Sequence, residues 1–183
     1  MTEAYQEWRQ MGGDPSFTVT EADRKYIGER LRFRLVHLTE KIPIHPPGGE
    51  RYEIPFGGGF VPKWDVIEFN MASVDTALEL LFQKVGAPLN PEGEGRVVVG
   101  EMEKVTAHEL VHVFQRLRFP TVEAYYQEYG RLKRIVVQQV GWERAEYLHP
   151  MEKEAYGFVR FYFYHQYGIE LPALPVEDPG IPP

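Results

Sequence analysis

One segment, residues 101–117, constrains the fold more than any other part of the chain, because it carries two different faces at helical spacing. Apolar side chains such as Leu110 and Phe114 recur along one face, while His108 and His112 lie four residues apart on the other. A helix with this pattern buries its apolar face in a core and turns the histidine pair toward a polar site. The sequence therefore predicts a helix here, with a core on one side and a site on the other.

The spacing of the two histidines also favours metal binding. Residues four apart on a helix lie about 5–6 Å from each other, so His108 and His112 can direct both imidazoles at one metal ion. Glu109 lies one step round the helix, where it can reach a water on that metal without being a ligand. The alternative is a chance pair of buried histidines on an ordinary amphipathic helix.

Residues 105–114, Val-Thr-Ala-His-Glu-Leu-Val-His-Val-Phe, resemble the active-site helix of the zincin metallopeptidases. In that superfamily the two histidines bind zinc, and the glutamate between them is the general base and proton shuttle. The resemblance implies a zincin-like fold and one Zn²⁺ per chain. It makes His108 and His112 metal ligands and Glu109 the catalytic residue. It covers this helix and one turn of chain farther on.

A tetrahedral catalytic zinc needs a third protein ligand in addition to a water. Zincins with a third histidine place it soon after the second, with a glycine between, but residues 113–119 contain neither. The gluzincin branch instead takes a glutamate from a later helix, followed three positions on by alanine or another small residue. Glu152, with Ala155 after it, fits this pattern and is our predicted ligand. Glu154, with Gly157 after it, is the alternative.

The helix predicted over residues 150–167 does not separate these two candidates. Both Glu152 and Glu154 fall within its apolar arc, and an unpaired buried carboxylate is costly, so at least one should meet a metal or a cation. An ordinary salt-bridged glutamate is the alternative for either. His149 is a further candidate ligand in the preceding loop. Some gluzincins place an acid four residues after the ligand glutamate to orient a histidine, but Tyr156 stands there.

The resemblance implies a small zinc-dependent peptidase that acts on a peptide or protein substrate. A metal-activated water would lose its proton to Glu109, attack the peptide carbonyl, and leave Glu109 to protonate the departing amine. Related enzymes stabilise the oxyanion with a tyrosine or histidine. Several tyrosines remain open for that role, among them Tyr125, Tyr126, Tyr147 and Tyr156.

Three other functions remain open at this stage. The chain could be a non-catalytic zinc-containing domain that binds peptides or proteins, or a regulatory peptidase with one dedicated substrate. The Pro-rich tail, residues 170–183, could also lie in the cleft and restrain activity. Residues 96–99 are predicted as a strand, and this strand could be the sheet edge along which a substrate peptide adds.

Length and composition limit the number of domains, the kinds of partner and the kinds of metal ligand that this chain can have. The 183 residues, 43 % hydrophobic and 26 % charged, predict a single domain over 1–183 that ends in the Pro-rich tail, and the resemblance implies that this domain is zincin-like. A net charge of −7 disfavours nucleic acid as a partner, and the lack of cysteine excludes thiolate ligands. No secretory signal or long apolar run is present, so we expect a cytoplasmic protein without a membrane partner. The oligomeric state stays open.

Local patterns predict an α+β fold with helices dominating the C-terminal half, and the resemblance implies a small mixed sheet packed on the active-site helix. A helix follows the cap at Thr20, while residues 32–38 fit a helix or a strand. The other expected elements are an irregular excursion at 43–62, strands at 66–69 and 96–100, and helices at 73–85, 121–140 and 150–167.

Overall fold

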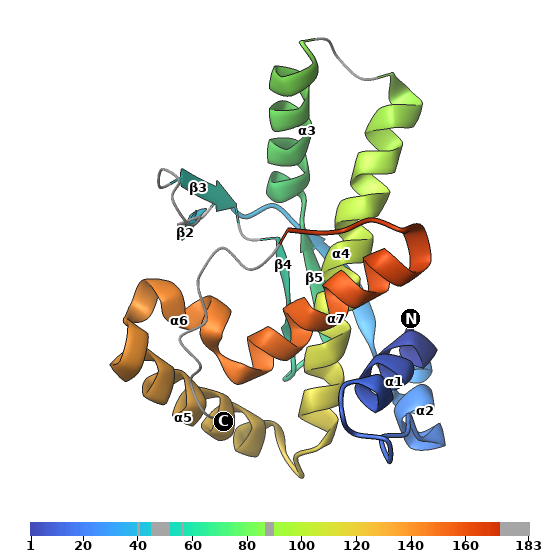
Figure 1. Ribbon diagram of the computed structural model, residues 1–183, viewed down its shortest axis with the longest axis vertical. Coiled ribbons are helices and arrows are strands. Elements are labelled where there is room, and N and C mark those ends of the chain that lie inside the picture. The colour runs from blue at the N-terminus through green and yellow to red at the C-terminus, as the bar shows by residue number, and fades with distance from the viewer. Residues whose placement is uncertain (40, 45–51, 56, 87–89, 173–183) are drawn as a thin grey trace.

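The computed structural model describes residues 1–39, 41–44, 52–55, 57–86 and 90–172, and helices make up most of them. A small sheet completes the mixed fold, so the predicted α+β class is confirmed (Figure 1). No helix in these ranges has the length and apolar character needed to cross a membrane. The helices are α1 (Thr2–Met11), α2 (Glu21–Glu29), α3 (Met71–Val85), α4 (Pro91–Leu117), α5 (Val122–Val140), α6 (Trp142–Leu148) and α7 (Pro150–Tyr167).

Three strands form the main sheet in the order β1-β5-β4, where β1 is Arg32–Val36, β5 is Val66–Asn70 and β4 is Gly58–Val61. Strand β1 runs parallel to the central β5, whereas β4 runs antiparallel to it. Strands β2 (Lys41–Ile44) and β3 (Tyr52–Pro55) form a separate antiparallel pair. Residues 32–38, which fitted a helix or a strand, therefore contribute a strand.

Helix α4 begins ten residues earlier than its periodicity suggested. The Asn90 side chain accepts a hydrogen bond from the Gly93 amide, and Pro91 occupies the first turn, where its missing N–H has no cost. The helix then continues without a break to Leu117. The predicted strand at residues 96–100 is therefore wrong, and so is its proposed role as a sheet edge. A valine run between glycines is compatible with either structure, and the helix cap decides between them.

Two more expectations need correction. The excursion at 43–62 contains β3 and β4, and β2 ends within it; residues 45–51 and 56 lie outside the described residues. The strands β2, β3 and β4 are only four residues long, and the Pro/Gly-rich sequence around them hid their pairing with the nearby strands of the chain. Helices α1 and α6 were not predicted either. In the tail, residues 173–183 lie outside the described ranges, so its placement in a cleft stays an expectation.

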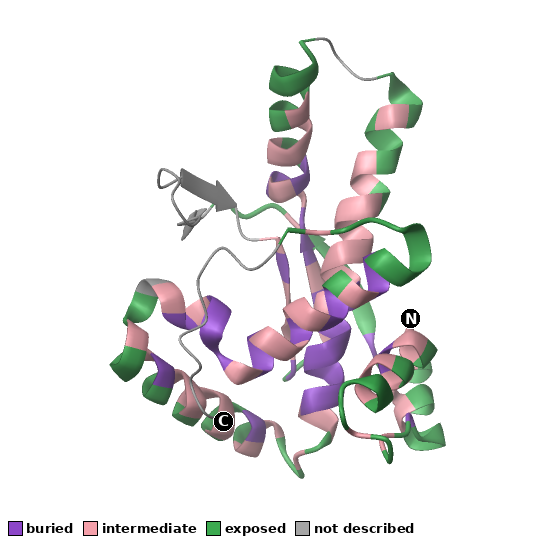
Figure 2. Ribbon diagram, in the orientation of Figure 1, coloured by how far each residue is buried: buried purple, intermediate pink, exposed green. Residues whose placement is uncertain are grey.

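The core surrounds the C-terminal half of α4 (Figure 2). Leu110 and Phe114 pack with α7 residues, including Phe158, in one apolar cluster. Val113 packs with β5, where Ile67 is fully buried. The apolar face predicted for this helix is thus the face that joins it to α7 and to the sheet.

Strand β4 crosses α4 at unusually close range because residue 58 is glycine. A Cβ atom there would lie 2.6 Å from the Val105 side chain and 2.3 Å from the Glu68 carbonyl oxygen, both far inside contact distance. Only a residue without a side chain lets the strand pass so near the helix. This approach brings Phe60, two residues farther along β4, over the histidine segment of α4.

Candidate metal centre

Three donor atoms from two helices converge beside α4. His108 Nε2 and His112 Nε2 lie 3.2 Å apart, and Glu152 Oε2 on α7 lies 3.1 Å from the first and 3.3 Å from the second. His112 and Glu152 are buried, and His108 is partly buried. Helical spacing places the two imidazoles together, and the packing of α7 across α4 brings the carboxylate to them (Figure 1).

These separations fit a metal ion. Ligands about 2.0–2.1 Å from a tetrahedral centre lie roughly 3.3–3.4 Å from one another. The three measured distances, 3.1 to 3.3 Å, are close to that value. Two imidazole nitrogens and a carboxylate oxygen are common ligands for divalent cations. The cluster of His108, His112 and Glu152 could therefore hold a metal ion.

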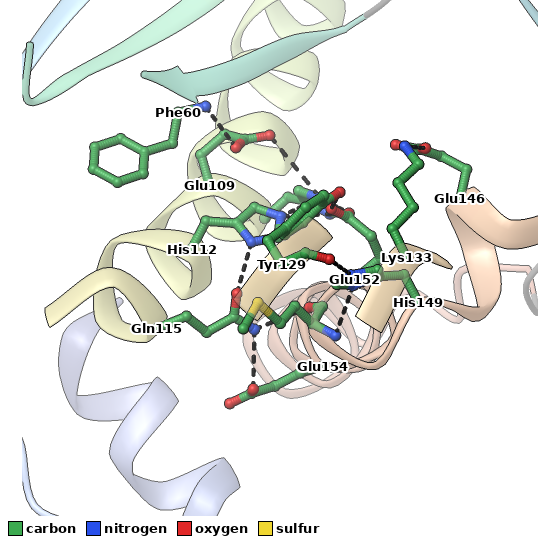
Figure 3. Close-up of polar contacts among 12 residues, drawn as sticks. Phe60, Glu109, His112, Gln115, Tyr129, Lys133, Glu146, His149, Glu152 and Glu154 are labelled. Atoms are coloured by element: carbon green, nitrogen blue, oxygen red, sulfur yellow. Dashed lines mark hydrogen bonds and ion pairs between the residues drawn. The ribbon is translucent and has the colours of Figure 1, made fainter. Parts of the chain in front are cut away.

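The carboxylate of Glu152 is oriented by a tyrosine that sequence analysis missed. Tyr129 on α5 donates its hydroxyl hydrogen to Glu152 Oε1 at 2.7 Å, which leaves Oε2 toward the histidines (Figure 3). Burial raises the pKa of Glu152, but His112 and His108 outweigh burial and hold the pKa well below its usual range. Glu152 therefore presents a negatively charged oxygen to the cluster. The only sequence signal for Tyr129 is its position four residues after Tyr125, one of the tyrosines considered for the site.

The pKa of His112 is tied to the same carboxylate. Burial lowers this pKa, but Glu152 outweighs burial and raises it to about 9. Near neutral pH, His112 and Glu152 therefore attract each other as ions when no metal is bound. A metal ion at the cluster must compete with that proton.

His149, the further candidate ligand, has other partners. Its Nδ1 accepts a hydrogen bond from the Met151 amide at 3.2 Å, which caps the start of α7. Its Nε2 lies 3.0 Å from the Tyr129 carbonyl oxygen, and the two rings stack with centroids 4.1 Å apart. Both ring nitrogens are engaged, so His149 supports Tyr129 and the helix start instead of joining the donor cluster.

Glu154 points away from the histidines (Figure 3). It forms ion pairs with Arg9 on α1 and with Arg118. Burial raises the pKa of Glu154, but Arg118 and hydrogen bonds from Tyr5 and Gln115 lower it below the usual range overall. Of the two candidate glutamates, the structure thus joins Glu152 to the histidines and gives Glu154 cationic partners.

Glu109 lies beside the donor cluster. Its Oε1 is 4.0 Å from His108 Nε2, and its Oε2 accepts a hydrogen bond from the Phe60 amide on β4 at 2.8 Å (Figure 3). Burial raises the pKa of Glu109, while His108 and His112 oppose that rise. Sequence analysis missed Phe60, because a backbone N–H leaves no side-chain pattern. The nearby glycines 57–59 were the available sign of a close backbone approach.

The candidate tyrosines lie at different distances from the cluster. The ring of Tyr156 meets the His108 ring edge-on, with centroids 4.6 Å apart, and Tyr147 packs behind it at 6.0 Å. Tyr125 is buried, and its pKa is raised by burial and by Glu152 and Glu109. Tyr126 is 48 % exposed. Tyr125 and Tyr156 are therefore the two whose surroundings include the site.

No protein-family model matches this chain, and no match was found among curated proteins or among solved structures. The case for a function therefore depends on the geometry and chemistry of the site.

Proposed function

We propose that this chain is a small zinc-dependent peptidase of the zincin type, in the gluzincin branch. The observation that carries the proposal is the convergence of His108, His112 and Glu152, with Glu109 held beside them. An H-E-x-x-H helix and a glutamate from a later helix are the ligand sources expected for that branch. The zincin-like assignment of the fold is part of the same proposal.

The composition of the cluster favours a catalytic zinc over a structural one. Structural zinc sites are closed by four protein ligands, whereas catalytic sites keep a position for water. Here His108, His112 and Glu152, the donor group found among the described residues, would supply three ligands. Bound zinc would supply Lewis acidity, which lowers the pKa of water toward neutrality and polarises a peptide carbonyl.

Glu109 is the proposed general base. The Phe60 amide holds one of its carboxylate oxygens, which leaves the other facing the donor cluster. In the proposed reaction Glu109 takes a proton from the attacking water and then delivers it to the departing amine. Its distance from His108, 4.0 Å, suits a residue that works beside the ligands and is not one of them.

The proposed substrate is an extended peptide segment. Strand β4 pairs with β5 alone among the strands that the structure describes, so its other edge, apart from the Phe60 amide that donates to Glu109, can accept an added strand. The Phe60 amide faces Glu109 from that edge. A peptide lying along β4 would therefore pass the donor cluster, and main-chain hydrogen bonds would hold it largely independently of its sequence.

The first test is the zinc content of purified protein by elemental analysis. We expect about one zinc per wild-type chain, as for a catalytic site, and loss of zinc in His112→Ala and Glu152→Gln. Glu154→Gln should still take up about one zinc when the metal is in excess, because Glu154 is not a ligand in the proposed site, and it is the comparison for Glu152→Gln. His165→Ala, at an exposed position, is the control for the histidine. Wild-type protein that takes up no zinc after incubation with it would overturn the proposal.

The second test separates an enzyme from a binding domain. Casein and a mixture of unstructured peptides are incubated with zinc-loaded wild type and with zinc-loaded Glu109→Gln. Cleavage by the wild type, reduced by about 10²–10⁴-fold in the variant, supports a peptidase with Glu109 as base. A zinc-loaded wild type that binds peptides without cleaving them would favour the non-catalytic zinc domain instead.

A further inference from the structure

A chain of hydrogen bonds lies behind His112, on the side of the ring that faces away from the donor cluster (Figure 3). His112 Nδ1 and Gln115 Oε1 are 2.8 Å apart. The amide nitrogen of Gln115 donates to the Met151 carbonyl and to Glu154 Oε2, each at 3.0 Å. These contacts join α4 to α7 directly behind the metal centre.

The two acceptors determine the direction of the Gln115 amide. A backbone carbonyl and an ionised carboxylate can accept hydrogen bonds but cannot donate them. The nitrogen of Gln115 must therefore face Met151 and Glu154, and its oxygen must face His112. Because that oxygen only accepts, the hydrogen of neutral His112 is on Nδ1, and Nε2 keeps its lone pair for a metal.

The other carboxylate oxygen of Glu154, Oε1, is also held by hydrogen bonds. It accepts hydrogen bonds from the Tyr5 hydroxyl at 2.6 Å, from Arg118 at 3.2 Å, and from Arg9. Ion pairs with both arginines keep Glu154 a carboxylate, so it cannot reverse its role and donate to Gln115. Helix α1, which supplies Tyr5 and Arg9, is therefore part of the support behind His112.

Helix α1 is fixed in place by aromatic packing. Tyr5 is fully buried, and its ring stacks on Phe114 of α4 with centroids 4.8 Å apart. Trp8 lies against Gly157 of α7, where an added Cβ would be 3.1 Å from the indole. The glycine thus lets the indole approach the backbone of α7. The support behind His112 is built on a rigid part of the core.

We propose that Gln115 and Glu154 are positioning residues for the metal centre: they hold His112 in the tautomer whose Nε2 binds the ion. The inference depends on the proposed zinc site and deepens it. It gives Glu154 a function distinct from the ligand role considered for it from the sequence. Zinc affinity then depends on side chains that never touch the ion.

The test measures zinc affinity by chelator competition. Gln115→Met keeps the size of the side chain and removes the acceptor, so affinity should fall by roughly 10- to 100-fold. Zinc affinity should fall less in Glu154→Gln, because an amide at that position can still offer an oxygen to the Gln115 amide nitrogen. Leu110→Met, on the core face of the same helix, is the matched control and should keep wild-type affinity. Unchanged zinc affinity in folded Gln115→Met would overturn the inference.

A second readout follows the Nδ1 hydrogen itself, by nitrogen-15 NMR of the imidazoles in zinc-loaded protein. Wild type should show a His112 Nδ1–H that exchanges slowly with solvent, and Gln115→Met should lose that protection. A wild type without a protected Nδ1–H contradicts the inference even if Gln115→Met does not fold. If the proposed function itself were wrong, the wild type would bind no zinc. A wild type that binds zinc but lacks the protected Nδ1–H therefore contradicts this inference alone.

Discussion

The two ends of helix α4 lie in opposite environments, although the helix is continuous. From Glu109 to Gln115 every residue is buried, whereas none from residue 91 to residue 100 is (Figure 2). The C-terminal end packs against α7 and the sheet, while the N-terminal end lies beside α3 (Figure 1). Tertiary packing therefore stabilises one end, and the other depends largely on local helix-forming interactions.

This difference explains where the candidate metal centre lies. Donor atoms must keep their separations to within a few tenths of an ångström, which requires side chains fixed by their neighbours. The exposed end contains Gly95 and Gly100, which weaken a helix by roughly 1 kcal/mol each relative to alanine. The buried end has no glycine and carries the histidines.

The largest contrast should come from truncating one apolar side chain at each end. Phe114→Ala removes a buried ring that stacks on Tyr5 and should lower the free energy of unfolding by about 3–5 kcal/mol. Val99→Ala removes a side chain that is 63 % exposed and should change it by less than about 0.5 kcal/mol. Urea unfolding followed by circular dichroism measures both. Similar losses at the two ends would contradict the comparison.

Metal removal should affect the buried end alone. Zinc at about 100 times its dissociation constant should stabilise the fold by about 2.7 kcal/mol, and a chelator should abolish that gain. Hydrogen exchange of the metal-free protein should speed up for amides of residues 107–115 and stay unchanged for residues 91–100. Equal acceleration along the whole of α4 would mean that the metal stabilises the helix as one unit.

The same comparison shows which parts of the fold can be predicted from sequence. Helices α5 and α7 were expected within one or two residues of their observed ends, because long periodic segments flanked by prolines and glycines leave few alternatives. The N-terminal end of α4 was mistaken for a strand. Its apolar residues are not buried, so they show no clear helical periodicity, and the helix start signal at Asn90 and Pro91 lies several residues before the valine run.

Some residues of the candidate site could likewise be predicted from the sequence, and others could not. Spacing on one helix was enough to bring His108 and His112 together and to put Glu109 next to them. It could not choose between Glu152 and Glu154, because that choice depends on where Arg9 and Arg118 lie in space. Contacts from other elements were missed altogether, since neither a backbone amide on β4 nor a hydroxyl on α5 leaves a pattern near the histidines.

A smaller effect is expected where β4 meets the buried end of α4. Gly58→Ala forces a Cβ into the Glu68 carbonyl and the Val105 side chain, which should cost about 1–3 kcal/mol of unfolding free energy. The strand must move, so the Phe60 amide should lose Glu109, and peptide cleavage should fall as well. Gly57→Ala is the matched control, because its Cβ would meet Val105 at an ordinary 3.6 Å. Equal stability of the two variants would disprove the close approach.

The smallest effect, and the only stabilising one, should come from the exposed end. A Cβ added at Gly95 or at Gly100 meets nothing within 4 Å, so alanine at either position should raise the free energy of unfolding by about 0.5–1 kcal/mol. Affinity for the proposed zinc should not change, because neither position contacts the candidate metal centre. Gly157→Ala is the matched contrast inside the core: its Cβ would lie 3.1 Å from the Trp8 ring, and it should destabilise. If Gly95→Ala and Gly100→Ala instead weakened zinc binding, the exposed end of α4 would be coupled to the site, and the two ends would have to be treated as one functional unit.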